Sequence, residues 1–375
     1  MDRPVQPAMK TIVVSAVNIR KGGTLTILRQ CLSCLSDLAL QKGWRIVSIV
    51  HRRDLCDYPA IEYIELPHVA KSWGRRLWCE YITMHRISKQ LGSIDLWFSL
   101  HDTTPRVIAK RQAVYCQTSF PFLKLNYRDL SFDPKIVLFA LFTRFAYLIN
   151  IHRNYRLVVQ AEWLRNGFAH MFGIPASHFI VAPPPTPAPH SASNHTKEAY
   201  TQFFFPSTAD CHKNFELACQ AAQLLEHEIG TDKFRLIITI QGEENSYSRW
   251  LKKQWDSVKS IQFAGFMSKT QLITTYAQCD ALVYPSRVET WGLAISEYGT
   301  YNKPMLLADL PYAHETSAGC SQVAFFPAND PQALMSLMKR LIQGDRSMLS
   351  PNPQKEIPQP TAKNWQELFD HLLQE

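Results

Sequence analysis

Hydrophobic and polar positions along the chain alternate between two kinds of segment. Short runs rich in β-branched residues, such as TIVVSAVNI at 11–19 and WRIVSIVH at 44–51, predict buried strands. Longer runs with apolar residues every three or four positions, such as TLTILRQCLSCLSDLAL at 24–40, predict amphipathic helices. Because the two kinds of segment follow each other repeatedly, we expect an α/β protein with parallel sheets.

This alternation stops once and then resumes. Residues 181–196, VAPPPTPAPHSASNHT, are rich in proline and end in a polar tail, which predicts a linker. We therefore expect an N-terminal Rossmann-like domain over 1–182, a linker over 183–196, a C-terminal Rossmann-like domain over 197–360, and a C-terminal helix over 361–375 that packs back toward the N-terminal domain. Sheets of this kind bind ligands at the carboxyl ends of their strands, so we expect function in the cleft between the two domains.

Bulk composition agrees with a folded, two-domain protein. The chain has 375 residues, of which 46% are apolar and 19% charged. Its cysteines lack the spacing of a zinc site or a disulfide framework. The N-terminal segment MDRPVQPAMK lacks the apolar run of a signal peptide. We expect a cytoplasmic protein, either free or peripheral on the inner face of the cell membrane.

The longest apolar stretch is IVLFALFTRFAYLINI at 136–151, which is interrupted by Arg144 and Asn150. It is too short and too charged to span a membrane. Two interpretations stay open, namely a buried helix and a helix that lies on a membrane surface. Residues 1–180 carry a net charge of +12 and the rest of the chain −4, which favours partners such as anionic lipid or phosphate-bearing substrates. Nucleic acid is a third candidate, although no recognition motif accompanies the charge.

Candidate chemistry gathers in PSRVETWGLAISEYG at 285–299, where Glu289 and Glu297 stand eight positions apart. A strand ends at Pro285 and Ser286, and a helix is expected to begin near Gly292. The start of a helix exposes unpaired amides and suits a phosphate. The two acids are too far apart to chelate one metal ion. The segment therefore predicts a site for a phosphorylated, hydroxyl-rich molecule, without a metal.

The segment resembles the E-x7-E motif of retaining glycosyltransferases of family 4, which have the GT-B fold. Other stretches resemble the same family in the same order: GGT at 22–24, VVQAEWLRNGFAHMFGIPASHFIVAPPP at 158–185, FAGFMSKTQLITTYAQCDALVYPS at 263–286, and EYGTYNKPMLLADLPYAHE at 297–315. The resemblance implies two Rossmann-like domains with parallel sheets facing across a cleft. The N-terminal domain would bind the acceptor and the C-terminal domain the nucleotide-sugar.

The resemblance also implies roles for individual residues. Glu289 would contact hydroxyls of the donor sugar, Glu297 would contact the ribose, and Lys213 would neutralise the diphosphate leaving group. Backbone amides would hold the distal phosphate, and other residues would border the base or let the backbone approach the phosphates. The amides are those of Thr290, Trp291, Gly292 and Leu293. The base would lie beside Phe263, Gly265 and Phe266. Gly22 and Gly23 would let the backbone come close to the phosphates.

Two departures from the family pattern stand out. Ser207 and Thr208 occupy the places where the family usually has an arginine, so Lys213, the helix start and His212 would have to supply the missing charge. Gln117 stands where the acceptor domain often has a histidine, and His101 is the candidate substitute. His101 is equally suited to a structural role at a strand end.

The resulting expectation is a retaining glycosyltransferase that needs no metal or other cofactor. It would move a sugar from a nucleotide-sugar to a hydroxyl of a lipid-linked oligosaccharide, in the synthesis of a surface polysaccharide such as O-antigen, capsule or exopolysaccharide. One alternative is a nucleotide-sugar 2-epimerase of the same fold. Another is a basic nucleic-acid-binding protein.

Overall fold

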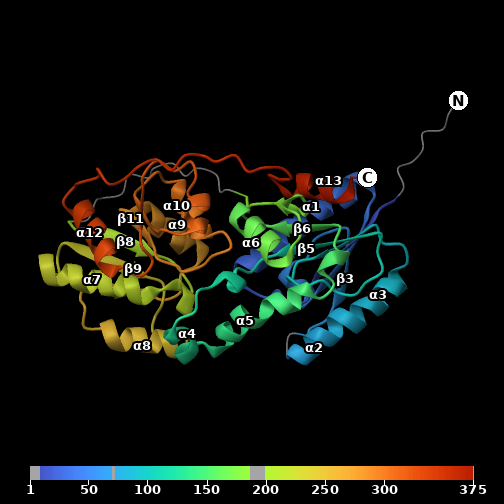
Figure 1. Ribbon diagram of the computed structural model, residues 1–375, viewed down its shortest axis with the longest axis horizontal. Coiled ribbons are helices and arrows are strands. Elements are labelled where there is room, and N and C mark those ends of the chain that lie inside the picture. Colours follow the sequence, from blue (N-terminus) through green and yellow to red (C-terminus); the bar gives the residue numbers. More distant parts are fainter. Residues whose placement is uncertain (1–8, 70–71, 186–198, 375) are drawn as a thin grey trace. The chain divides into compact units, whose positions relative to one another are not determined.

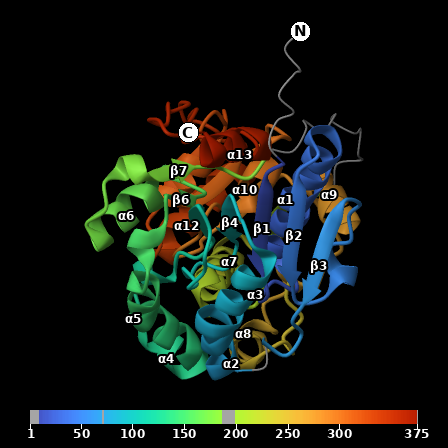
Figure 2. The same cartoon turned by 90° about the vertical axis from the view of Figure 1, so that its right-hand side faces the viewer.

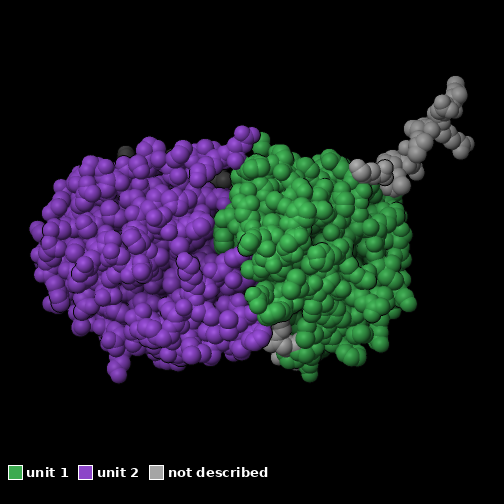
Figure 3. All heavy atoms as spheres, in the orientation of Figure 1, with its two compact units in different colours: residues 1–118, 143–185, 357–375 green, residues 119–142, 186–356 purple. Residues whose placement is uncertain are grey.

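The structure of the chain is a computed structural model that describes residues 9–69, 72–185 and 199–374 (Figure 1). The residues divide into two compact units, which Figure 3 colours separately. The first unit contains residues 1–118, 143–185 and 357–375, and the second contains residues 119–142 and 186–356.

The first unit is built on a seven-stranded sheet in which every pair of neighbours is parallel, with the order β3-β2-β1-β4-β5-β6-β7. Its strands are β1 (Thr11–Ala16), β2 (Arg45–Val50), β3 (Ile61–Glu65), β4 (Leu96–Ser99), β5 (Arg111–Cys116), β6 (Arg156–Val159) and β7 (Phe179–Val181). Its helices include α1 (Gly22–Lys42), α2 (Trp73–Trp78), α3 (Met84–Leu91), α6 (Glu162–Phe172) and α13 (Trp365–Leu373).

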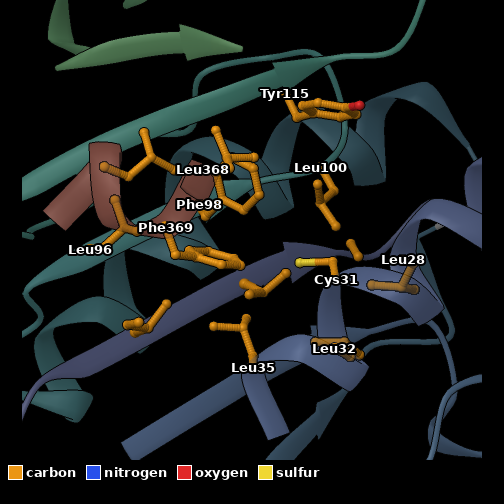
Figure 4. Packing of buried hydrophobic residues seen from close by; sticks show 14 of the residues in the cluster. Leu28, Cys31, Leu32, Leu35, Leu96, Phe98, Leu100, Tyr115, Leu368 and Phe369 are labelled. Carbon is orange, nitrogen blue, oxygen red and sulfur yellow. The ribbon is translucent and has the colours of Figure 1, made fainter. Parts of the chain in front are cut away.

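The last helix of the chain completes the core of the first unit. Helix α13 lies beside α1 (Figures 1 and 2), and Figure 4 shows Leu368 and Phe369 of α13 packed with side chains of α1, β4 and β5. The rings of Phe98 and Phe369 meet edge to face, with their centroids 5.7 Å apart. Burial of such aromatic side chains holds residues 361–374 in the first unit, although they follow the second unit in sequence.

The second unit has a six-stranded parallel sheet with the order β10-β9-β8-β11-β12-β13. Its strands are β8 (Thr201–Phe205), β9 (Phe234–Ile238), β10 (Ile261–Phe263), β11 (Ala281–Tyr284), β12 (Met305–Ala308) and β13 (Val323–Phe326). Its helices are α4 (Tyr127–Phe132), α7 (Phe215–Ile229), α8 (Ser246–Trp255), α9 (Lys269–Gln278), α10 (Leu293–Gly299), α11 (Pro311–Thr316) and α12 (Pro331–Ile342). Two parallel, Rossmann-like sheets confirm the predicted fold class.

The unit boundaries differ from the expected domain limits most clearly at residues 119–142, and also at 357–360, which were expected in the C-terminal domain but belong to the first unit. Residues 119–142, which we call the arm, were expected in the N-terminal domain but cluster with the second unit. The arm contains α4 and the first part of α5 (Pro134–Leu148), which continues into the first unit at Thr143. Of the expected linker, residues 186–196 lie outside the described residues, and 183–185 form no regular element.

Helix α5 contains most of the apolar stretch at 136–151, for which two interpretations were open. Ile136 and Tyr147 are buried, whereas Leu138, Leu141 and Phe142 are exposed. The interpretation as a buried helix is therefore wrong for one side of α5, and that exposed side needs a separate explanation. No helix in the described part of the chain combines the length and hydropathy of a membrane-spanning segment.

Candidate active site

The candidate site is built from two loops of the second unit. One follows β8 and contains a short 3₁₀ turn, Cys211–Lys213, and the other runs from the end of β11 to the start of α10. Because β8 and β11 are parallel neighbours, both loops leave the same edge of the sheet. The backbone N–H of Arg287 donates to the carbonyl of His212 at 2.8 Å, and the Asn214 side-chain amide donates to the carbonyl of Pro285 at 3.1 Å. These bonds fix the two loops against each other.

At the centre of the site, Lys213 and Glu289 form an ion pair. The Nζ of Lys213 lies 2.6 Å from Oε1 of Glu289, and the Tyr284 hydroxyl donates to the same oxygen at 3.0 Å. Burial, with the nearby charge of Glu289, raises the pKa of Tyr284 well above its usual value, so the phenol stays protonated as a donor. Both bonds fall on Oε1. Oε2 therefore carries neither bond and can accept a hydrogen bond from a ligand hydroxyl.

Glu297 lies on α10, whereas Glu289 precedes that helix. The helix begins at Leu293, directly after Gly292, as the sequence predicts. Gly292 has φ of 87°, where a side chain is strained, and a Cβ there would come 3.3 Å from Ile295. This glycine lets the chain turn sharply from Glu289 into α10. The Tyr276 hydroxyl donates to Oε2 of Glu297 at 3.2 Å and so orients this second carboxylate.

Four buried polar side-chain atoms of these loops have no hydrogen-bond partner in the described structure. They are Nδ1 of His212, Oγ of Ser286, Nε of Arg287 and Nε1 of Trp291. Buried polar groups are normally satisfied, and exceptions often mark a place where a ligand or water binds. Each of the four is within five positions of Lys213 or Glu289 in sequence. Their grouping supports a polar ligand at these loops.

His212 is the neighbour of Lys213 that was expected to add positive charge to the site. Burial lowers the pKa of its imidazole well below the usual value, and the charges of Lys213 and Arg287 lower it further. The ring is therefore neutral near pH 7. The expectation that His212 would help to replace the positive charge of the missing arginine stays a prediction, and in the absence of a ligand its imidazole adds no charge beside Lys213.

The other predicted donor-side residues occupy strand ends of the same unit. Ser207 follows β8, and its N–H donates to the Thr239 hydroxyl at 2.7 Å. Thr208 is exposed and donates its hydroxyl to Asp210 at 2.5 Å. Phe266, three positions beyond β10, is 89% exposed, and Gly265 before it has φ of 74°. An aromatic ring so exposed at a strand's carboxyl end is available to stack on a base.

One cation of the site was missed by sequence reasoning. Arg287 forms a two-bonded ion pair with Asp129 of the arm, and the side chains are 13% and 0% exposed. The same guanidinium donates to the carbonyl of Cys211 at 3.2 Å. Arg287 thus joins the arm to the loop that presents Lys213. No local signal could reveal this pair, because its members are 158 positions apart in sequence.

In the first unit, His101 and Gln117 follow the neighbouring strands β4 and β5. His101 is 3% exposed; its Nε2 lies 3.0 Å from the Ser15 hydroxyl and its Nδ1 lies 3.2 Å from that of Thr103. Burial lowers the pKa of His101 to about 4. A neutral, enclosed ring with both nitrogens engaged favours the structural role at the strand end over contact with a substrate.

Gln117 is also held by its neighbours. Its side-chain amide donates to the carbonyl of Leu100 at 2.8 Å, and its N–H donates to the Asp102 carboxylate at 2.5 Å. Asp102, which the sequence did not single out, has φ of 68°, and burial raises its pKa to about 6. Gly22 and Gly23 are exposed at the start of α1, and only Gly22 requires a left-handed backbone, with φ of 71°.

Comparison with known proteins adds to this geometry. Residues 189–356, which include both loops, match the family model described as Glycosyl transferases group 1. The chain carries a glycosyltransferase domain. This finding confirms the expected enzyme class. No match was found among the sequences of curated proteins.

Solved structures extend the similarity to nearly the whole chain. A glycosyltransferase from Rickettsia africae is 14% identical, with a TM-score of 0.62, 98% of this chain covered and 94% of that one. HepE from Anabaena, solved with UDP-glucose, is 12% identical, with a TM-score of 0.61 and coverage of 97% and 95%. WaaG, a glycosyltransferase involved in lipopolysaccharide biosynthesis, is 13% identical, with a TM-score of 0.59 and coverage of 89% and 90%. At these identities the comparison shows the shared GT-B fold.

Proposed function

We propose that the protein is a retaining glycosyltransferase of family 4 that moves a sugar from a nucleotide-sugar to a hydroxyl of a lipid-linked oligosaccharide. The product would belong to a surface polysaccharide, such as O-antigen, capsule or exopolysaccharide. The observation that carries the proposal is the Lys213–Glu289 pair, which joins a cation and a carboxylate at the carboxyl edge of the second sheet. A nucleotide-sugar offers both a diphosphate and a hydroxyl-rich ring to such a pair.

Each group then has a role in donor binding. Lys213 donates to the diphosphate with the ammonium hydrogens that Glu289 does not use, and it stabilises the charge that develops as the bond to the sugar breaks. Oε2 of Glu289 accepts from a hydroxyl of the donor sugar. Glu297 accepts from the ribose, in the orientation set by Tyr276. Amides at 290–293 take the distal phosphate, and Phe266 borders the base.

Retention of configuration would follow from attack by the acceptor on the face that the diphosphate leaves. A phosphate oxygen then takes the acceptor proton, so no protein base is required at that point. The reaction needs no metal if Lys213 and the backbone amides carry the leaving-group charge. We place the acceptor near the carboxyl ends of β4 and β5, with His101 and Gln117 as positioning residues.

The acceptor proposal draws on charge and surface. The basic residues concentrate in positions 1–180, and WaaG, a fold relative, takes part in lipopolysaccharide biosynthesis. We propose that the protein works at the inner face of the membrane, where an anionic lipid surface attracts such a charge. The 2-epimerase and the nucleic-acid-binding alternatives have no separate support in the structure.

A thermal-shift panel of UDP-, GDP- and ADP-sugars tests the donor site. The correct donor should stabilise the protein by about 2.7 kcal/mol at a hundredfold excess over its Kd. The Lys213→Ala variant should lose most of that shift. Lys233→Ala, which removes an exposed lysine at the amino end of β9, serves as the matched control. Absence of a shift with every nucleotide-sugar would refute the proposal, and conversion of the nucleotide-sugar to its 2-epimer without an acceptor would favour the epimerase.

A further inference from the structure

The outer side of the arm presents large apolar side chains to solvent. Tyr127 and Leu130 of α4 are 71% and 65% exposed, and Leu138 and Leu141 of α5 are 57% and 50% exposed. Single exposed apolar residues are common on proteins, but a group of this size within fifteen positions marks an interaction surface.

Helix geometry places the α5 members on one stripe. Leu141 and Phe142 lie three and four positions after Leu138, so the three side chains share one face of the helix. Lys135 precedes Leu138 by three positions and borders the stripe on one side. The helix continues with the same spacing to Phe145, and Arg144 borders the stripe on its other side. An apolar stripe between two cations is typical of a helix that lies in a membrane interface.

The inner side of the arm is anchored firmly in the second unit. Asp129 pairs with Arg287, and the Asn126 side chain caps α4 through a reciprocal bond with Asp129. The ring of Phe132 packs against Trp250 with the centroids 5.2 Å apart. Ile136 is 5% exposed. Because these contacts fix the arm, the outer apolar side chains cannot turn inward to escape water.

Charge decides which partner fits this surface. The arm has only two acidic residues, and neither would repel a negatively charged partner. Asp129 is buried against Arg287, and Asp133 is partly buried and accepts a hydrogen bond from the backbone N–H of Ile136 at 3.2 Å. Lys124 and Lys135 are exposed. A second copy of this face would bring like charges together across a two-fold axis. An anionic lipid headgroup layer complements both the cations and the apolar stripe.

We infer that the arm is the membrane-docking surface of this protein: the apolar side chains of Tyr127, Leu130, Leu138 and Leu141 enter the interface of an anionic bilayer, while Lys124 and Lys135 contact lipid phosphates. The inference deepens the proposed function and rests on it for the lipid-linked acceptor, but the binding itself requires no catalysis. It also places the docking surface on the unit that carries Lys213 and Glu289.

Vesicle flotation tests the inference. The protein should float with phosphatidylcholine vesicles that contain phosphatidylglycerol, and much less with phosphatidylcholine alone. The double variant Leu138→Glu/Leu141→Glu should bind at least about tenfold more weakly, because two apolar side chains leave the interface. Leu40→Glu, at a 65% exposed position of α1, is the matched control and should bind as the wild type does.

The same variants separate the possible failures. A normal thermal shift with the nucleotide-sugar shows that the double variant is folded and that its donor site is intact. If the wild type binds no vesicle, or if the double variant binds as tightly as the wild type, the docking surface is refuted while the donor site stands. A wild-type dimer that the double variant dissociates, without vesicle binding, would replace the bilayer with a second copy. Loss of the nucleotide shift in the wild type would refute the proposed function and leave the vesicle result unaffected.

Discussion

The ammonium of Lys213 and the hydroxyl of Tyr284 meet on the same oxygen of Glu289, at 2.6 and 3.0 Å. This arrangement holds a carboxylate in a largely buried position and keeps its second oxygen for a ligand. It also holds the lysine in place before any ligand arrives. Preorganised charges of this kind cost little reorganisation during reaction, which is why they stabilise a transition state more effectively than mobile side chains do.

Replacing Lys213 with alanine should reduce kcat at least about a hundredfold, since the diphosphate would leave without its nearest cation. Steady-state release of nucleotide in the presence of acceptor measures the effect. Lys233→Ala should leave kcat unchanged. A Lys213→Ala enzyme within a few-fold of the wild type would show that another group stabilises the leaving diphosphate.

The two acids should differ in their kinetic effect. Glu289→Gln keeps the shape of the side chain but loses the ion pair with Lys213, so we expect kcat to fall at least about a hundredfold. Glu297→Gln would weaken the proposed contact to the ribose, which is expected to be the same before and during reaction, so KM should rise with little change in kcat. Glu356→Gln, at an exposed position of the same unit, is the control. Equal effects of both acids on kcat would contradict the division of roles.

Local sequence patterns predicted most strands and the turn of the site, whereas contacts between distant segments were missed. The strands β1, β2 and β11 were predicted because continuous apolar runs indicate a strand that is buried on both faces. The turn before α10 was predicted from Gly292 and the two acids, which are local. Strands β3, β7 and β13 were missed. Glutamates interrupt the apolar residues of the edge strand β3, β7 has only three residues, and β13 is a short strand at the edge of the second sheet. The Asp129–Arg287 pair depends on packing between distant segments, which no local pattern encodes.

Breaking the Asp129–Arg287 pair should destabilise the second unit. Asp129→Ala leaves the largely buried guanidinium of Arg287 without its carboxylate, at a cost of about 3 to 5 kcal/mol. Denaturant unfolding measures the change. The double variant Asp129→Leu/Arg287→Met should recover most of the lost free energy of unfolding, because neither charge stays buried alone. A double variant as unstable as Asp129→Ala would contradict this account.

The Asp129→Leu/Arg287→Met variant should turn over more slowly than the wild type, even though its stability is restored. Arg287 donates to the carbonyl of Cys211 and so helps to place Lys213. The expected effect is a lower kcat with an intact vesicle affinity, provided that the melting temperature is near the wild-type value. An unchanged kcat would show that the remaining bond between the Arg287 N–H and the His212 carbonyl suffices to position the loop.

The pH dependence of stability should reveal two opposed groups in the first unit. Burial lowers the pKa of His101 to about 4 in the folded protein. As the pH drops from about 6.5 toward 4, this histidine therefore becomes protonated in the unfolded chain before it does in the folded protein, and the free energy of unfolding decreases. The pKa of Asp102 is raised to about 6, so its contribution has the opposite sign and stability falls as the pH rises through the same window. The two slopes offset each other in the wild type.

Single substitutions should separate these slopes. Asp102→Asn should steepen the loss of the melting temperature on acidification from pH 6 to pH 4, because the His101 contribution then stands unopposed. His101→Gln should flatten that loss relative to the wild type. Melting curves at several pH values provide the test, and parallel profiles for all three proteins would show that neither group changes its pKa on folding.

A crystal structure with the nucleotide-sugar that gives the largest thermal shift tests the central claim most directly. We predict that a diphosphate oxygen lies within hydrogen-bond distance of the Lys213 ammonium, that a sugar hydroxyl donates to Oε2 of Glu289, and that the ribose contacts Glu297. A nucleotide-sugar bound away from both loops, or bound with its sugar far from Glu289, would contradict the account.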